Sequence, residues 1–409
     1  MNGNINKSQT QQSLHYFLFD PNIYISVNLT FKRKSDDLSI EKIKSAVEKA
    51  YTQNETTMSK VVLDNGNAYF ENMSETGCKV FVDSRNWLDI LNENQKNTFK
   101  INEGELIRTF IIDGKDEISV FIMAHHIVGD GYALILLAQD ILSNLAGEAV
   151  EYKPLNNQDD EVFPKIKYPF MQKLGIKLLN AQWKKAGKVF TWEDYYNIHQ
   201  KFWENRKTNV STTTVSEDEL LRMKEESKKL GITINSYIIA KQVEKNPEYE
   251  IIGIPTSYRG NNRSLANKIA AVKVRYHYNT EASFEENAKA IHEVIKDSIE
   301  DPSKRFFVVQ SVALFAPTLV DGALMAKYAG YKNETAEKMT GVMAMSGENK
   351  THLGVTNLTN IKLKTEYDSF KVQDVKITAA SMATARDVLA VCTLENKMNL
   401  CFSKVEEVK

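Results

Sequence analysis

The chain has 409 residues and a mass of 46.5 kDa; 42% of its residues are apolar and 26% are charged, which predicts a folded protein of about two or three domains and excludes a disordered chain. Its 52 basic and 53 acidic residues leave a net charge of −1, which argues against the concentrated basic surface of broad nucleic-acid binders. The three cysteines, Cys78, Cys392 and Cys401, form no CxxC pair, which favours a reducing compartment and argues against a zinc ribbon.

The sequence predicts neither a secretory signal nor a membrane span. The first twelve residues are polar and contain no apolar stretch of the kind that signal peptides have. The longest apolar run, residues 132–145, is interrupted by Gln139 and Asp140 and is shorter than the roughly 20 residues that cross a bilayer. We therefore expect a cytoplasmic protein.

The first half of the chain predicts an alternation of strands and helices. Residues 24–31 alternate in the manner of a strand, and Ser39 is placed to cap a helix that runs to Tyr51. Asn65-Gly66 predicts a hairpin within 60–72, and a second hairpin is expected around residues 113–116. A long apolar helix should follow over 132–146 and end at Gly147.

The pattern loosens between 148 and 208, and the second half then repeats the mixture of strands and helices. We therefore expect an N-terminal lobe over 1–165, a crossover linker over 166–208 and a C-terminal lobe over 209–409. In the second half, the capping box of Ser216 and Glu219 predicts the start of a helix that ends at Gly231. Two further helices are expected over 232–244 and 284–300. Strands are expected near 211–215, 251–255, 271–278, 353–363, 374–382, 388–394 and 398–402.

The pattern His125-His126-x-x-x-Asp130-Gly131 is the most specific feature of the sequence, because the whole chain has only seven histidines. An apolar strand leads into the histidine pair and a helix follows it. Neighbouring side chains of a strand point to opposite faces, so we expect one histidine to be buried and the other to act as a general base. The same divergence, with the absence of HExxH, argues against a metal site.

Asp130 and the two glycines beside it have structural interpretations as well. Asp130 could cap the helix that follows, or it could pair with a buried arginine, and the two roles are compatible. Gly129 and Gly131 are typical of a tight loop in which the backbone lies close to a ligand or adopts unusual dihedral angles.

The segment HHIVGDG resembles the motif of the chloramphenicol acetyltransferase-like acyltransferases, a superfamily that includes nonribosomal peptide synthetase condensation domains and alcohol acetyltransferases. Four other segments resemble family segments in the same order, namely 99–112, 231–235, 253–260 and 354–361. The last of them, GVTNLTNI, resembles a segment of the alcohol acetyltransferase-like branch. The whole resemblance covers about residues 14–403. The resemblance implies an α/β protein of two α+β sandwich lobes, which form a pseudo-dimer with a substrate channel between them. It also implies that Arg259 pairs with Asp130.

The resemblance further implies direct transfer of an acyl group from a thioester to a hydroxyl or amine, with His126 as the general base supported by Asp130. His125, Gly131 and Arg259 would have structural roles. No GxSxG nucleophile is present, which agrees with transfer without an acyl-enzyme. Thr356 and Asn357 are oxyanion or substrate-binding candidates by position only, and a turn at the end of a strand explains them equally well.

The expected ligands are an acyl thioester and a small-molecule acceptor, with no cofactor, metal or nucleic acid, and the expected state is a monomer. Arg263 and Lys268 belong to a basic stretch that could bind coenzyme A phosphates, although ordinary surface cations explain it equally well. A carrier-protein-bound donor, as in peptide synthetase condensation, is an alternative. A catalytically inactive binding protein is another, because QNETTMSK (53–60) replaces a basic family segment and Thr359 replaces a family glycine.

Overall fold

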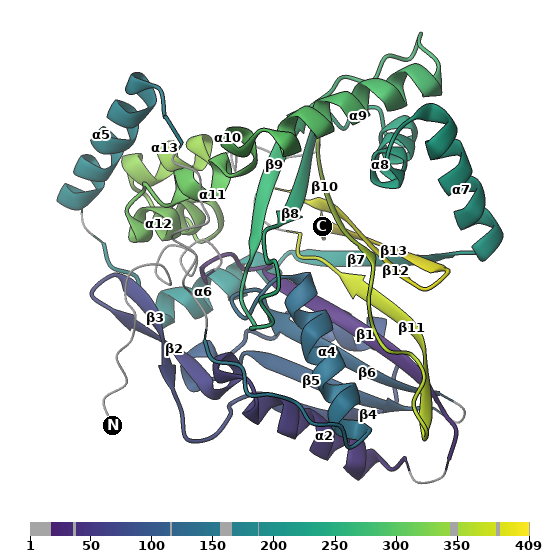
Figure 1. Cartoon of the computed structure of the whole chain (residues 1–409). Coiled ribbons are helices and arrows are strands. Elements are labelled where there is room, and N and C mark those ends of the chain that lie inside the picture. Colours follow the sequence, from purple (N-terminus) through teal and green to yellow (C-terminus); the bar gives the residue numbers. More distant parts are fainter. Residues whose placement is uncertain are drawn as a thin grey trace.

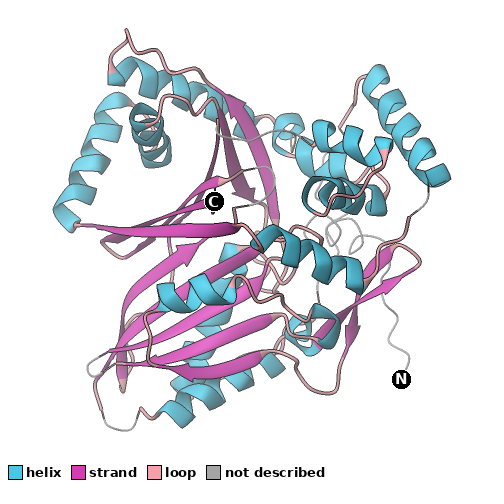
Figure 2. Ribbon diagram, turned by 180° about the vertical axis from the view of Figure 1, so that it is seen from behind, coloured by secondary structure: helices cyan, strands magenta, loops and turns pink. Residues whose placement is uncertain are grey.

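The computed structural model describes residues 18–35, 38–114, 117–155, 166–186, 188–343, 351–381 and 385–408. It is a mixed α/β structure with two large β-sheets, and these lie in different halves of the molecule (Figures 1 and 2). A small separate hairpin joins two further strands, β2 (Ser59–Asp64) and β3 (Asn67–Asn72). Asn65 and Gly66 turn this hairpin with φ of 48° and 81°, as the Asn-Gly pair predicts.

The first sheet has the strand order β11-β1-β6-β5-β4, with β6 at its centre. Its strands are β1 (Tyr24–Arg33), β4 (Lys79–Asp83), β5 (Ile107–Asp113), β6 (Glu117–His125) and β11 (Phe370–Thr378). Residues 120–125 of β6 are all fully buried, because the sheet is covered on both faces. The paired helices α2 (Ile40–Thr52) and α4 (Gly131–Leu145) cover one of these faces (Figure 1). The expected strand, hairpin and helices of the first half are thus confirmed, with Ser39 accepting a hydrogen bond from the Lys42 N–H.

The second sheet has the order β7-β13-β12-β10-β8-β9. Its strands are β7 (Arg206–Val215), β8 (Ile251–Ser257), β9 (Ile269–Arg275), β10 (His352–Asn360), β12 (Asp387–Leu394) and β13 (Lys397–Glu407). Three expected helices pack beside it, namely α7 (Glu217–Leu230), α8 (Ile234–Lys245) and α9 (Phe284–Glu300). Their apolar faces and the sheet form a separate core that includes Ile239, Ile252 and Ile291.

Strand β11 connects the second half of the chain to the first sheet. It lies far along the chain, within the expected C-terminal lobe of 209–409, yet it pairs antiparallel with β1 at the edge of the first sheet (Figure 1). Thr378 lies opposite Ser26, and their hydroxyl groups are 2.6 Å apart. Asn399 of β13 in turn donates to the Val375 carbonyl at 2.8 Å. The C-terminal segment therefore ties the two sheets together.

The expected crossover linker, 166–208, is mostly helical. It contains α5 (Phe170–Ala186) and α6 (Trp192–Trp203) and enters β7 at Arg206. Thr191 and Asp194 form a capping box that starts α6. The stretch 156–165, which begins Asn-Asn-Gln-Asp-Asp, lies outside the described residues.

Several short elements were not predicted from the sequence. They are α3 (Trp87–Asn94), α10 (Pro302–Arg305), α11 (Phe307–Val312), α12 (Pro317–Tyr328), α13 (Glu334–Val342) and the 3-10 turns Glu55–Met58 and Ile101–Glu103. Helices α12 and α13 add buried residues such as Leu319 and Met339 to the core of the first sheet. A short helix has too few turns for a clear 3.6-residue pattern, so tertiary packing decides its presence.

Candidate active site

The histidine motif lies where β6 ends and the chain turns into α4. The His126 N–H donates to the Ile23 carbonyl at 2.9 Å, which extends the pairing of β6 with β1 by one bond. The Val128 N–H then bonds the His125 carbonyl at 3.0 Å and closes the turn. The motif is thus held by main-chain bonds at the end of a buried central strand, and such a rigid support suits a catalytic group.

His125 is the structural member of the pair. Its ring is fully buried against the rings of Tyr24 and Phe99, with centroids 6.1 and 6.3 Å away. Its Nδ1 accepts a hydrogen bond from the Ile127 N–H at 3.2 Å, which assigns the proton of the neutral ring to Nε2. Burial lowers the pKa of His125 well below its usual value. The ring is therefore neutral and stabilises the turn.

His126 follows directly and contacts a different part of the chain. Its carbonyl accepts a hydrogen bond of 2.7 Å from the side-chain amide of Asn267, which belongs to the segment between β8 and β9. The exposed fraction of His126 is 9%. Burial lowers the pKa of His126, and the nearby charge of Asp130 only partly opposes this effect. The imidazole is therefore neutral at neutral pH and able to accept a proton.

Asp130 combines the two roles that the sequence left open. Its Oδ1 accepts from the Ala133 N–H at 2.9 Å and caps α4. Its Oδ2 accepts from Arg259 Nη2 at 2.9 Å and from the Lys268 N–H at 2.9 Å. The side chains of Arg259 and Asp130 are only 2% and 4% exposed, so this ion pair is fully buried. It joins the loop between β8 and β9 to the histidine motif of the first sheet.

Arg259 also organises its own loop, which we call the 258–268 loop. Its Nη1 donates to the Ser264 carbonyl at 2.7 Å, and its Nη2 donates to the Ala266 carbonyl. Gly129 is needed where this loop packs, because a Cβ there would lie 2.6 Å from the Ala133 Cβ and 3.1 Å from the Ala266 nitrogen. The glycine thus allows a close approach between two segments of the chain.

Gly131 does not have the expected conformational role. Neither Gly129 nor Gly131 has a positive φ. A Cβ on Gly131 would meet only Leu358 of β10, at an ordinary 3.6 Å. The contact shows instead that the end of β10 lies beside the start of α4, so the structure brings the 354–361 segment to the histidine motif.

Thr356 and Asn357 lie near the end of β10, and both are half-buried. The Asn357 amide donates to Asn235 Oδ1 at 3.1 Å, and its Oδ1 accepts from the Thr359 N–H at 2.7 Å. These bonds tie β10 to the start of α8 and form a turn, and the oxyanion role of the two residues stays a prediction. Thr359 adopts a φ of 47°, a left-handed conformation that a β-branched residue rarely takes and that the glycine of the related segment would take freely.

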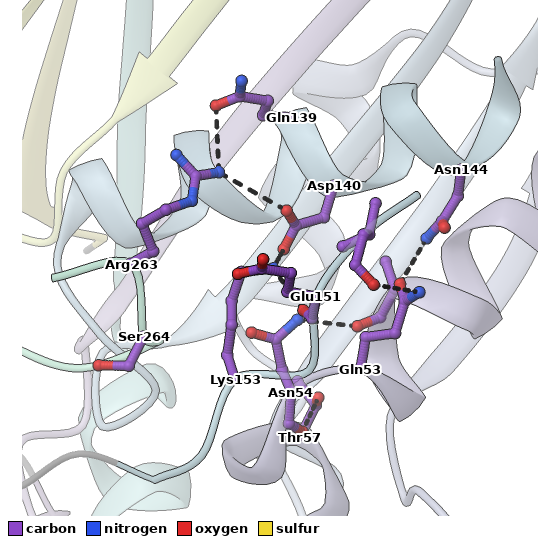
Figure 3. Close-up of polar contacts among 12 residues, drawn as sticks. Gln53, Asn54, Thr57, Gln139, Asp140, Asn144, Glu151, Lys153, Arg263 and Ser264 are labelled. Atoms are coloured by element: carbon purple, nitrogen blue, oxygen red, sulfur yellow. Dashed lines mark hydrogen bonds and ion pairs between the residues drawn. The ribbon is translucent and has the colours of Figure 1, made fainter. Parts of the chain in front are cut away.

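The two cations proposed for coenzyme A lie in different surroundings. Arg263 is half-exposed and reaches α4, with Nη2 3.4 Å from Gln139 Oε1 and 3.8 Å from Asp140 Oδ1 (Figure 3). Asp140 is already paired with Lys153 Nζ at 2.7 Å. Lys268 is only 3% exposed. A phosphate in solvent could therefore reach Arg263 but not Lys268, so burial speaks against Lys268 as a coenzyme-binding residue.

The 53–60 segment, which departs from the family pattern, supports the 258–268 loop. Thr56 Oγ1 donates to the Leu265 carbonyl at 2.9 Å. Gln53 Oε1 accepts from the Asn144 amide of α4 at 2.8 Å (Figure 3). The replaced segment thus contacts the loop that carries Arg259.

Sequence reasoning assigned no role to His199, which the structure places near the motif. His199 is fully buried on α6, its Nδ1 lies 3.1 Å from the Tyr24 hydroxyl, and Tyr24 in turn packs against His125. Burial lowers the pKa of His199 to about 3. Its contact with Tyr24 spans 175 residues of sequence, and no local pattern marks such a pair.

The buried neutral histidines predict a loss of stability in mild acid. Because the pKa of His199 falls from 6.5 to about 3 on folding, the unfolded chain binds the extra proton first as the pH drops. Stability is therefore complete above about pH 6.5 and declines toward pH 3, by up to about 1.4 kcal/mol per pH unit for this group. Urea unfolding of wild type and His199→Gln at pH 7 and pH 5 should show a smaller pH effect in the variant; equal effects would contradict the prediction.

Among the described residues, no group of three His, Cys, Asp or Glu side chains is arranged to hold a metal ion. No helix within those same ranges is long and apolar enough to cross a bilayer.

Comparisons with known proteins identify the architecture. No protein-family model matches the chain, and no curated protein sequence matches it either. Solved structures do match: the TRI3 trichothecene 15-O-acetyltransferase from Fusarium sporotrichioides is 11% identical, with 97% of this chain and 90% of that chain covered and a TM-score of 0.64. The chain has the two-lobed chloramphenicol acetyltransferase-like fold.

Two further structures support this assignment of the fold. The first condensation domain of the calcium-dependent antibiotic synthetase is 10% identical over 98% of this chain and 90% of that domain, with a TM-score of 0.59. The wax ester synthase/diacylglycerol acyltransferase from Marinobacter aquaeolei VT8 is 11% identical over 96% and 92% of the two chains, with a TM-score of 0.56. At such identities the likeness concerns the fold, and the chemistry must be argued from the residues of this chain.

Proposed function

We propose that this protein is an acyltransferase that moves an acyl group from a thioester to a hydroxyl or amine, with His126 as the general base. The observation that carries the proposal is the setting of His126. It is a neutral imidazole at the end of a rigid buried strand, beside the Asp130–Arg259 pair. The same motif occupies a fold that the structure shares with acetyltransferases and condensation domains.

In the proposed reaction, His126 accepts the proton of the acceptor hydroxyl or amine as that atom attacks the thioester carbonyl. The carbon–sulfur bond then breaks, and the thiolate leaves with a proton returned by the imidazolium. No covalent enzyme intermediate is needed. In support of direct transfer, burial raises the pKa of the Cys78 thiol to about 11 and keeps it protonated.

Thiol release tests the proposal. The full chain would be mixed with a panel of acyl-coenzyme A donors and with small alcohols and amines, and the free thiol would be measured with a chromogenic disulfide. Acceptor-dependent thiol release by wild type supports acyl transfer. No release with any donor, together with tight binding of an acylated carrier protein or of a small ligand, would favour a carrier-dependent condensation enzyme or an inactive binding protein.

Arg263 discriminates between free coenzyme A and a carrier-bound donor. If its guanidinium binds coenzyme A phosphates, Arg263→Gln should raise the apparent KM for acyl-coenzyme A about three- to tenfold and leave kcat nearly unchanged, as expected for lost uniform binding. A short pantetheine thioester lacks those phosphates, so its apparent KM should be the same for wild type and variant. Arg275→Gln, an exposed cation on β9, is the matched control. Equal losses with both donors would reject Arg263 as a coenzyme-binding residue.

A further inference from the structure

Helix α5 exposes a stripe of apolar side chains that the protein core does not cover. Phe170, Met171 and Leu178 are 75%, 73% and 54% exposed, and Leu174 is 37% exposed. Phe170, Leu174 and Leu178 are spaced four residues apart, so they lie on one face of the helix, with Met171 beside them. We call these four residues the α5 stripe. Such a row is unusual on the surface of a soluble domain and indicates an interaction site.

The opposite face fastens α5 to the rest of the molecule. Ile176 and Trp183 are buried, and Trp183 Nε1 donates to Thr318 Oγ1 of α12 at 2.8 Å. A Cβ on Gly322 would lie 2.6 Å from the Trp183 ring, so the helix packs tightly there. The packing of Trp183 fixes the orientation of α5, so the stripe faces away from the rest of the molecule. Helix α5 lies at the edge of the molecule in both views (Figures 1 and 2).

The charged residues of the chain segment that contains α5 all have one sign. Residues 162–192 contain seven lysines and no acidic residue, although the whole chain has a net charge of −1. On a helix that turns 100° per residue, Lys173, Lys177 and Lys184 form a row along one side of the stripe. Within the described parts of the chain, none of these three lysines pairs with a carboxylate, and all three are exposed.

A neighbouring segment that contacts α5 also exposes apolar side chains. Phe307 and Leu314, at the two ends of the α11 region, are 38% and 40% exposed. The Asn180 amide of α5 donates to the Leu314 carbonyl at 2.8 Å, and the ring of Phe307 packs 5.7 Å from that of Tyr168, just before α5. Exposed apolar side chains in this region thus come from more than one helix.

We propose that α5 docks this protein on the surface of an anionic membrane. The stripe would enter the boundary between headgroups and acyl chains, while the lysine row would lie at the level of the phosphates with its aliphatic stems beside the lipid. A symmetric contact with a second copy of the chain would bring two lysine rows together, which like charges disfavour. The proposal concerns peripheral binding and does not rest on the proposed acyl transfer.

Vesicle flotation tests the proposal with the full chain. Vesicles of phosphatidylcholine mixed with phosphatidylglycerol should carry wild type upward, and vesicles of phosphatidylcholine alone should carry much less. The variant Phe170→Ser/Leu174→Ser/Leu178→Ser should lower the apparent partition constant at least about tenfold, because it removes the inserted apolar surface. The variant Lys173→Gln/Lys177→Gln/Lys184→Gln should lower it by a similar factor and weaken its dependence on salt.

A matched control on α7 separates specific docking from a general change in the surface. Leu221→Ser/Lys224→Gln/Lys228→Gln changes one exposed apolar residue and two exposed lysines there, and flotation should not change. All changed side chains are exposed, so the melting temperatures of the three variants should match wild type. Absence of flotation, or flotation that neither α5 variant weakens, would overturn the proposal. The proposal would also be overturned if the protein did not bind vesicles and the α5 variants instead abolished its self-association or its binding to an acidic protein.

Discussion

Replacing His126 by alanine is expected to lower turnover about 100- to 10,000-fold while the melting temperature barely moves. The size of the effect is that of a positioned general base. The fold should survive because two bonds of residue 126 involve its main chain and remain in the variant. Its N–H donates to the Ile23 carbonyl, and its own carbonyl accepts from the Asn267 amide. The measurement is kcat in the thiol-release assay, beside a thermal melt.

His126→Gln and His125→Ala are the informative controls. Glutamine keeps hydrogen-bonding groups but cannot take up a proton, so it should be as inactive as alanine if His126 is the base. His125→Ala should mainly destabilise, by about 3 kcal/mol or more, since it empties a buried aromatic site and leaves the Ile127 N–H without its acceptor. Activity that survives in His126→Ala but vanishes in folded His125→Ala would refute the assignment.

The pH profile offers a check on the state of the base. Because burial holds the pKa of His126 below 6.5, kcat/KM should stay level as the pH falls through 6.5 and decline only at a lower pH. A decline centred at or above 6.5 would show that the base is not the buried imidazole.

Breaking the buried pair of Asp130 and Arg259 is expected to cost about 3–5 kcal/mol of unfolding free energy, because the remaining charge is left without its partner in the interior. Asp130→Asn is the sharper substitution at the first position, since its amide oxygen can still cap α4 at the Ala133 N–H. Arg259→Leu removes the cation and keeps an apolar stem. Urea unfolding at pH 7 measures each loss.

The double variant tests whether the two residues act together. If they are partners, Asp130→Asn/Arg259→Leu should be more stable than the sum of the single losses predicts, by about 0.5–3 kcal/mol. Additive losses would mean that Asp130 is only a helix cap. Turnover should fall along with stability in the single variants, because the pair joins the 258–268 loop, including Asn267, to the carbonyl of His126.

Local patterns in the sequence were sufficient for the motif and for the elements that carry it. The alternation of 24–31 and the apolar run before His125 encode β1 and β6, since side chains two residues apart share a face of a strand. Ser39, Ser216 and Gly231 mark helix ends because capping satisfies backbone groups within a few residues. The interaction of Asp130 with Arg259 came from the family resemblance, and the structure confirms it.

Only the tertiary structure decided which distant residues meet. Sequence spacing alone could not show that β11, which lies between strands of the second sheet in the sequence, pairs with β1 in the first sheet. It also could not show that Lys268 is buried or that His199 contacts Tyr24 beside His125. Each of these depends on strand pairing or burial between segments far apart in the chain, which no short window encodes. The exposed α5 stripe has the same origin, because its apolar pattern alone would equally fit a buried helix, and the packing of Trp183 on α12 determines which face points outward.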